Sequence, residues 1–403
     1  MRARTTERAP RRVRLGILTT HPIQYQVPWF RGLAACSDID LTVYFAMIPD
    51  AAQQSVGFER PFTWDIPLLD GYPYRVLTNT ARHPSVSSFW GCDTPEIRSI
   101  VRRGRFDAFL VNGWVAKCCL QLLMACQRHG VPCFVRGESN VLRPRAWWKR
   151  LFHRALLTRY AGVLSIGEAN RQFYLARGVR SDRIFATPYC VDNQRFAATA
   201  AGLMSDRLAL RDGWAIPHDA CVFLYCAKFI AKKRPHDVLA ALEIVARSGS
   251  PPGAQLLMVG SGELQAECQA FANQRRLPVT FAGFLNQSEI CKAYVAADCL
   301  VLPSDHGETW GLVVNEAMAC ARPAIVSDQV GCHPDLVVPD VTGDTYPMGD
   351  VAHLAEHMRR MIADPERRRR MGAAARDRVA RYSYDAVIRG TLAALGLRGI
   401  ARS

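Results

Sequence analysis

The chain has 403 residues, a formal net charge of +15 and 49% hydrophobic residues, and no apolar run approaches the roughly 18 residues that span a bilayer. Its length exceeds the roughly 250–300 residues at which one hydrophobic core stops growing, so two domains are expected. Because no zinc-finger spacing, RNP-like aromatic motif or basic heptad repeat accompanies the charge, we expect no nucleic acid as a partner.

The N-terminus and the cysteines indicate where the protein works. Residues 1–12 are rich in arginine and lack the apolar core of a signal peptide, so we expect a disordered basic arm. The 14 cysteines are scattered, mostly within apolar runs, and form no Cys-x-x-Cys pair. This usage is typical of buried thiols in a reducing compartment. We expect a cytoplasmic protein, with a peripheral position on the inner face of the membrane left open.

Apolar runs alternate with helix-length segments in two series, which is typical of parallel strands covered by helices on both faces. The expected strands are 13–18, 41–45, 106–111, 132–135, 162–166 and 183–186, then 221–226, 255–259, 279–282, 299–302 and 324–327. We predict an α/β fold of two Rossmann-like, doubly wound domains facing each other across a cleft. The N-terminal domain covers 13–196, a linker region 197–217, the C-terminal domain 218–381, and a last helical segment 382–403.

Polar residues follow the expected strands of the first domain. His21, Gln24 and Tyr25 belong to the run His-Pro-Ile-Gln-Tyr after the first strand, and Arg136 and Glu138 follow the strand 132–135. Ligands of this architecture bind at the carboxyl ends of the strands, so we take these five as acceptor-side candidates. The alternative for the first cluster is a turn in which His21 helps to cap a helix.

The segment 143–160 combines basic and aromatic residues. It holds six Lys or Arg, two Trp and a Phe, and no acidic residue. Interfacial helices pair basic faces with aromatic anchors, which favours docking on an anionic membrane surface near a lipid-linked acceptor. In the alternative, the aromatic side chains pack into the first domain and the arginines are simply solvated.

The second domain begins with a strand that ends at two cations. Lys228 and Lys233 follow the strand 221–226, where ammonium groups can neutralise a diphosphate and stabilise a departing nucleotide. Solvated lysines are the alternative. Gly260 opens a Gly-x-Gly turn that either ligand contact or tight packing explains. Gly283 and Phe284 follow the next strand.

Glu308 and Glu316 flank the start of an expected helix at Gly311. A helix N-terminus presents free N–H groups and a positive dipole end, which suit a diphosphate. Carboxylates on either side would accept hydrogen bonds from hydroxyl groups, so the pattern predicts a nucleotide sugar. The alternative is a solvated Glu308 and a Glu316 that only stabilises the helix start.

Several ordered motifs resemble those of the retaining glycosyltransferases of family 4, which belong to the group 1 glycosyltransferases. They are Glu308-x-x-Gly-Leu-x-x-x-Glu316, the segment from Lys228 to Lys233, the Gly260 turn and the segment around Asp192. The run His-Pro-Ile-Gln-Tyr resembles a bacterial subset that works on surface glycans, as in polysaccharide biosynthesis. The resemblance runs from residue 14 to about residue 395 and implies the GT-B fold.

The resemblance also implies roles. Glu316 would hold the ribose hydroxyls and Glu308 the sugar hydroxyls, while the backbone N–H groups of Gly311, Leu312 and Val313 would bind the phosphates. The loop at Gly283 and Phe284 would meet the nucleobase, and the catalytic set would be Glu308, Lys228 and Lys233.

The implied reaction is metal-independent transfer, with retention, from a nucleotide diphosphate sugar to a hydroxyl of a glycan, lipid-linked or other acceptor. The nucleotide sugar is then a substrate, and no cofactor or metal is expected. The chain departs from the family at Ala227 and Ala321, where Gly is usual, and at Lys228, where Arg is usual. The alternatives are a nucleotide-sugar 2-epimerase of the same fold and a non-catalytic glycan-binding relative.

Overall fold

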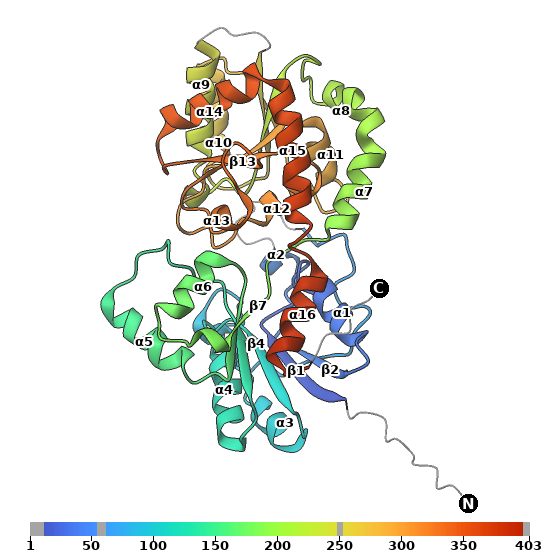
Figure 1. The fold of residues 1–403 in the computed structure, drawn as a ribbon, viewed down its shortest axis with the longest axis vertical. Coiled ribbons are helices and arrows are strands. Elements are labelled where there is room, and N and C mark those ends of the chain that lie inside the picture. The colour runs from blue at the N-terminus through green and yellow to red at the C-terminus, as the bar shows by residue number, and fades with distance from the viewer. Residues whose placement is uncertain (1–11, 55–61, 248–252, 398–403) are drawn as a thin grey trace, which may run out of the picture.

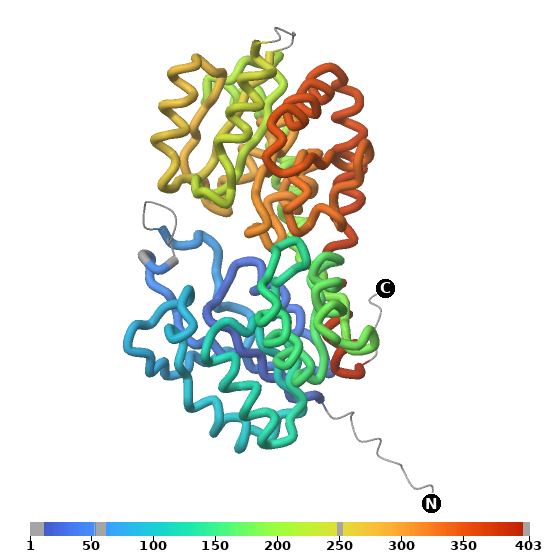
Figure 2. The backbone as a smooth tube through the Cα atoms, turned by 90° about the vertical axis from the view of Figure 1, so that its left-hand side faces the viewer, coloured from blue at the N-terminus to red at the C-terminus, as the bar shows by residue number. Residues whose placement is uncertain are grey.

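The computed structural model describes residues 12–54, 62–247 and 253–397. The described residues form two domains that lie end to end (Figures 1 and 2). Each domain contains one parallel β-sheet flanked by helices, so the predicted fold class is confirmed. Apart from residue 12, the basic arm expected at the N-terminus lies outside the described residues.

The first domain contains a seven-stranded sheet in the order β3-β2-β1-β4-β5-β6-β7, and every strand pair is parallel. Its strands are β1 (Val13–Thr19), β2 (Ile39–Phe45), β3 (Tyr74–Val76), β4 (Ala108–Asn112), β5 (Cys133–Arg136), β6 (Gly162–Ser165) and β7 (Ile184–Ala186). Its helices are α1 (Val27–Ala34), α2 (Ala51–Gln54), α3 (Ile97–Arg103), α4 (Lys117–His129), α5 (Trp147–Leu157) and α6 (Glu168–Leu175).

The second domain contains a six-stranded parallel sheet in the order β10-β9-β8-β11-β12-β13. Its strands are β8 (Cys221–Cys226), β9 (Ala254–Val259), β10 (Val279–Gly283), β11 (Cys299–Leu302), β12 (Ala324–Ser327) and β13 (Gly343–Tyr346). Its helices are α9 (Pro235–Arg247), α10 (Gln265–Gln274), α11 (Ile290–Ala296), α12 (Leu312–Ala319), α13 (His333–Leu336), α14 (Val351–Ala363) and α15 (Pro365–Val379).

Two stretches outside the sheets connect the domains. The expected linker region is largely helical, since it contains most of α7 (Asn193–Leu203) and all of α8 (Arg207–Gly213), and both pack on α11. Helix α16 (Tyr384–Ala394) begins at Ser383, whose Oγ accepts a hydrogen bond from the N–H of Ala386. It leaves the second domain and packs against α1, β6 and β7 of the first, as Figure 1 shows in red.

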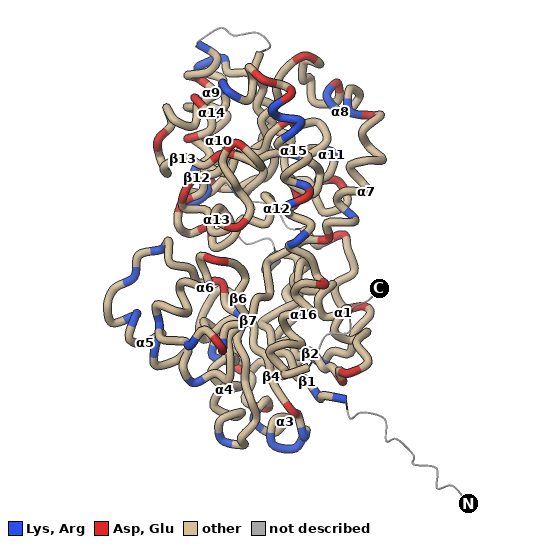
Figure 3. The backbone as a smooth tube through the Cα atoms, in the orientation of Figure 1, with Lys and Arg blue, Asp and Glu red and all other residues tan. Residues whose placement is uncertain are grey.

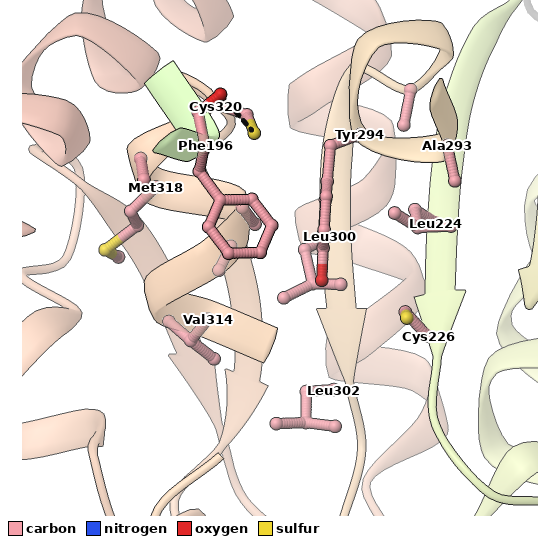
Figure 4. Close-up of a cluster of buried hydrophobic side chains, with 14 of the residues drawn as sticks. Phe196, Leu224, Cys226, Ala293, Tyr294, Leu300, Leu302, Val314, Met318 and Cys320 are labelled. Atoms are coloured by element: carbon pink, nitrogen blue, oxygen red, sulfur yellow. Dashed lines mark hydrogen bonds between the residues drawn. The ribbon is translucent and has the colours of Figure 1, made fainter. Parts of the chain in front are cut away.

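Helix α12 packs on the hydrophobic core of the second domain. Figure 4 shows Val314 and Met318 on this helix beside Leu302 of β11 and Phe196 of α7. All four side chains are buried. A fully buried apolar side chain contributes roughly 1.5–3 kcal/mol relative to exposure, so this packing holds the N-terminus of α12 in one position.

Two further findings concern the whole described chain. None of the 14 cysteines, all of which lie in the described ranges, forms a disulfide, and 13 of them are buried. Among the described residues, no helix has the length and apolar character needed to pass through a bilayer.

Candidate functional site

A cavity of about 410 Å³ lies between the two domains, at the carboxyl ends of their strands. The second domain contributes Lys228, Gly260 and Phe284, and the N-terminus and first turns of α12 contribute Leu312, Val313 and Glu316. Six residues predicted for the donor side therefore line this one cavity, namely Lys228, Gly260, Phe284, Leu312, Val313 and Glu316. The predicted Gly283 does not line it. We call it the donor cavity, after these six predicted residues.

Helix α12 starts at the donor cavity because of Gly311. This residue has φ +99°, in the left-handed region that favours glycine, and a Cβ there would lie 3.0 Å from Leu302 and 3.1 Å from Val330. The first N–H groups of a helix have no partner within it and carry the positive end of the dipole. Leu312 and Val313 begin the helix on the cavity wall, so this end of α12 is suited to an anion.

Glu316 lies one turn further along α12, where it is almost fully buried and lines the donor cavity. Its Oε2 accepts a hydrogen bond of 2.6 Å from the Tyr294 hydroxyl. Burial raises the pKa of Glu316, while the Tyr294 hydrogen bond and the charge of Arg195 oppose that rise. Glu316 is therefore a hydrogen-bond acceptor with a fixed position at the cavity wall.

Lys233 and Glu308 form a hydrogen-bonded ion pair in which Lys233 Nζ donates to Glu308 Oε2. Ser304 Oγ donates to the same oxygen at 3.3 Å. Both charged side chains are mostly buried, but neither lines the donor cavity. The structure thus brings Lys233 and Glu308 together beside the cavity rather than within it.

Lys228 lines the donor cavity, as do Arg31 and Arg195. Burial lowers the pKa of Lys228 first, and the charges of Lys232 and Lys233 lower it further. Such a site has an excess of positive charge, which an anionic ligand would neutralise. Gly260 lies directly against the backbone of Ala227, where a Cβ would come within 2.0 Å of the carbonyl oxygen. Tight packing therefore requires this glycine, whatever the ligand.

The first domain closes the donor cavity through the segment 62–67. The Phe62 ring lies 4.5 Å from the Phe284 ring, and Ser288 of the second domain donates its backbone N–H to Asp65 at 3.1 Å. Asn286 also donates to the carbonyl oxygen of residue 63 at 2.8 Å. Trp64 consequently lies on the cavity wall beside the Gly283–Phe284 loop.

A second cavity, of about 300 Å³, lies on the first domain where β1, β4 and β5 end. Arg136, Glu138, Trp114 and Gln26 line it, together with Thr309 from the second domain. We call it the acceptor cavity, after the acceptor-side candidates Arg136 and Glu138 that line it. Thr309 belongs to the loop between β11 and α12. A molecule bound in this cavity would therefore lie next to that loop, which we call the donor loop.

Glu138 accepts hydrogen bonds from residues of both domains. Its Oε1 accepts hydrogen bonds from the hydroxyls of Tyr25, at 3.3 Å, and Tyr189, and its Oε2 accepts one from Thr309 at 3.2 Å. Arg136 is buried and stacks on Tyr189, with 4.4 Å between the guanidinium carbon and the ring centroid, while its Nη2 donates to the Thr187 carbonyl oxygen. Arg136 thus fixes the Tyr189 ring, whose hydroxyl donates to Glu138.

The predicted run after β1 is divided between the two cavities. Gln24 and Tyr25 lie on the wall of the donor cavity, whereas Gln26, which the sequence analysis did not single out, lines the acceptor cavity. His21 lines neither cavity, and its Nδ1 lies 2.9 Å from the Thr20 hydroxyl. Burial lowers the pKa of His21 to about 4, so the imidazole is neutral at pH 7.

Trp64, Arg195 and Gln287 are donor-cavity residues that the sequence analysis missed. Arg195 donates to the Gln287 backbone carbonyl at 2.9 Å and to its Oε1 at 2.7 Å. These side chains reach the cavity through contacts between distant segments, and only the Asp192 motif just before Arg195 marked this part of the sequence. No group of three or more His, Cys, Asp or Glu among the described residues is arranged to hold a metal ion.

Known proteins resemble this chain in sequence and fold. Residues 206–378 match the family model described as glycosyl transferases group 1. A D-inositol 3-phosphate glycosyltransferase of Xylanimonas cellulosilytica is 31% identical over 229 residues, which cover 55% of this chain and 53% of the relative. A GDP-mannose-dependent monoacylated alpha-(1-6)-phosphatidylinositol monomannoside mannosyltransferase of Corynebacterium glutamicum is 30% identical over 206 residues, covering 49% and 52%. The chain thus spans about half the length of these curated relatives.

Solved structures share the fold over almost the whole chain. Anabaena HepE, crystallised in complex with UDP, superposes with a TM-score of 0.71 at 16% identity and covers 95% of this chain and 100% of its own. Sucrose-phosphate synthase from Thermosynechococcus elongatus gives a TM-score of 0.68 at 20% identity, covering 94% and 96%. The chain therefore has the GT-B fold of these structures, and residues 206–378 of its second domain are similar to the group 1 glycosyl transferases.

Proposed function

We propose that this protein is a glycosyltransferase that moves a sugar from a nucleotide diphosphate sugar to a hydroxyl group. The observation that carries the proposal is the donor cavity, where Lys228, the N-terminus of α12 and Glu316 line one space. A cation and a helix N-terminus suit a diphosphate, and a buried carboxylate suits ribose hydroxyls. The crystallised complex of HepE with UDP supports the same class of ligand.

In this reaction the bond between the anomeric carbon and the β-phosphate oxygen breaks, and a bond to the acceptor oxygen forms. The proton of the acceptor hydroxyl passes to the leaving phosphate. Negative charge grows on the nucleotide as it departs, so Lys228, Lys233 and the end of α12 stabilise the transition state more than the bound substrate. Glu308 orients the sugar through its hydroxyls.

We further propose retention of the anomeric configuration without a metal ion, as in the family 4 enzymes that the motifs resemble. The pairing of Glu308 with Lys233 supports a front-face route, because a carboxylate neutralised by a cation is a weak nucleophile. The lysines supply the positive charge that a metal would otherwise provide. Transfer is expected to persist in EDTA and to give a product with the donor's anomeric configuration.

The acceptor in this proposal is a glycan or a lipid-linked glycoconjugate, bound in the acceptor cavity on the cytoplasmic side of an anionic membrane. The named relatives work on inositol phosphate or phosphatidylinositol mannosides, which are polyhydroxylated acceptors carrying phosphate. The excess of basic residues in this chain favours such anionic partners. UDP-sugars and GDP-sugars are both donors to test.

The experiment is a nucleotide-release assay on a panel of UDP- and GDP-sugars, with and without a mixture of candidate glycan acceptors. The proposal predicts release of nucleotide diphosphate that depends on acceptor, with a mass-shifted acceptor as product. Release without acceptor, together with an epimerised free sugar, would indicate a 2-epimerase instead. Nucleotide-sugar binding without any release would indicate the non-catalytic relative.

A further inference from the structure

Helix α5 directs its large apolar side chains into solvent. The exposed fractions of Trp147, Trp148, Leu151 and Phe152 are 71%, 55%, 57% and 55%. Only Leu156 and Leu157, in the last turn, are buried in the first domain. The alternative in which both tryptophans and the phenylalanine of this segment pack into the first domain is therefore wrong.

The exposed residues form one continuous face. At about 100° per residue, Trp147, Trp148, Leu151 and Phe152 fall within an arc of about 140° on the helix surface. Lys149 lies beyond one edge of this arc and Arg154 beyond the other, and both are exposed. A helix on the surface of a globular protein normally turns its apolar face to the core, and here the apolar face turns outward.

The face is basic as well as apolar. The segment 143–160 contains six Lys or Arg and no acidic residue. Figure 3 shows basic positions along α5 and the loop before it. The Lys149 ammonium lies 5.1 Å from the centre of the Trp148 ring, so a cation stands beside the aromatic surface. This composition complements a surface that offers negative charge above an apolar layer.

Helix α5 lies beside the acceptor cavity. His153, on the opposite side of α5, contacts Trp114 with 6.2 Å between ring centroids, and Trp114 lines that cavity. Val115, the next residue, also lines the cavity and is 74% exposed. Figure 2 shows α5 at the front of the first domain, just below the second domain. A surface that covers α5 would therefore lie close to the mouth of the cavity.

We propose that α5 docks the protein on an anionic lipid bilayer, with the two tryptophans, Leu151 and Phe152 at the headgroup boundary and the basic residues on lipid phosphates. Docking there holds the acceptor cavity near the membrane, where a lipid-linked acceptor is presented. The lipid contact itself does not depend on the transfer reaction, because it uses no residue of the donor cavity. Failure of one proposal is thus distinguishable from failure of the other.

The test is co-sedimentation of the full chain with vesicles of phosphatidylcholine alone or mixed with phosphatidylglycerol, at low and high salt. Binding is expected only with the anionic lipid and is expected to fall with salt, because screening weakens the attraction of surface charges. Lys149→Glu/Arg150→Glu is expected to lower the partition coefficient about tenfold or more, since each basic group contributes to the attraction. Trp148→Ser/Phe152→Ser is expected to weaken binding at either salt concentration.

The matched control is Arg102→Glu/Arg103→Glu, which makes the same change in charge at the exposed end of α3. This helix lies at the far end of the first domain in Figure 1. Wild-type binding by the control, with unchanged melting temperatures for all variants, supports docking through α5. Equal loss in the control would show that only the overall charge matters. Equal binding to neutral vesicles, no binding at low salt, or a dimer that α5 variants dissociate would overturn the proposal.

Discussion

Thr309 of the second domain donates a hydrogen bond to Glu138 of the first, with 3.2 Å between Oγ1 and Oε2. The two residues belong to the loops that follow β11 and β5. The other carboxylate oxygen of Glu138 is held by Tyr25 and Tyr189. Glu138 therefore links the wall of the acceptor cavity to the donor loop that carries Glu308.

Glu138→Gln is expected to lower kcat about tenfold to hundredfold, because hydrogen bonds to a charged group contribute roughly 1.5–3 kcal/mol. A neutral amide accepts the Tyr25, Tyr189 and Thr309 hydrogen bonds less strongly and cannot accept all three. Glu289→Gln, at an exposed position before α11, is the control. Steady-state kinetics with unchanged kcat and KM would contradict a role for Glu138 in joining the two loops.

Glu316→Ala and Glu308→Gln are expected to act on different kinetic constants. Glu316→Ala removes the acceptor for the ribose and leaves the buried Tyr294 hydroxyl without a partner, so KM for the donor is expected to rise roughly tenfold or more. Glu308→Gln weakens the ion pair with Lys233 and is expected mainly to lower kcat. If both variants kept wild-type kinetics, the two carboxylates would only stabilise the start of α12.

Trp64→Leu is expected to raise KM for the donor with little change in kcat. Trp64 lines the donor cavity beside the Phe284 loop, where the nucleobase is expected, and stacking of a base on an aromatic ring contributes roughly 1–3 kcal/mol. Trp90→Leu, at a highly exposed tryptophan that does not line the donor cavity, is the control. A wild-type KM in Trp64→Leu would mean that the base does not contact the first domain.

The central strands of both sheets were predictable because their side chains are apolar without interruption, as in Cys221–Cys226, all six residues of which are buried. Strands β3 and β13 were missed. The three residues of β3 are all exposed, so no apolar run marks this edge strand. The buried Asp344 of β13 pairs with Arg367 of α15 at 2.8 Å, a compensation that only the folded chain reveals.

More of the residues named for the donor side than of those named for the acceptor side line a single cavity, and the reason is physical. Lys228 and Glu316 follow strands directly or begin the next helix, so local order in the sequence places them at the cavity. Trp64 and Tyr189 reach the site because two domains meet, and no periodicity in the sequence encodes that contact. The composition of α5 also left open whether its aromatic side chains face the core or the solvent, because composition does not determine burial.

His21 is expected to contribute to a loss of stability on acidification. Burial lowers its folded pKa from the ordinary value of 6.5 to about 4, so the unfolded chain binds more protons between these values. The free energy of unfolding therefore falls as the pH is lowered from about 6.5 to about 4, by at most about 1.4 kcal/mol per pH unit for this group. His21→Asn should reduce that slope in denaturant titrations, and the exposed-site control His129→Asn should not. Equal slopes in wild type and His21→Asn would contradict the assignment.

Ala321→Gly is expected to stabilise the protein by about 0.5–1 kcal/mol. Ala321 has φ +55°, a left-handed conformation just after α12, where glycine is usual because it has no Cβ. The gain is reduced by the greater entropy of glycine in the unfolded chain. Ala319→Gly, within the helix, should instead destabilise by about 1 kcal/mol. Urea denaturation measures both, and a loss of stability in Ala321→Gly would mean that the methyl group contributes packing that outweighs the strain.

The donor cavity is expected to bind a nucleotide diphosphate through its cations, and isothermal titration calorimetry with UDP and GDP measures this binding. We expect at least one of the two to bind, the corresponding monophosphate to bind more weakly, and Lys228→Met to lower the affinity for the diphosphate about tenfold or more. Lys232→Met, which removes a neighbouring exposed charge, is expected to have a smaller effect. Absence of binding by both diphosphates, or equal affinity in wild type and Lys228→Met, would show that the cavity is not a diphosphate site held by Lys228.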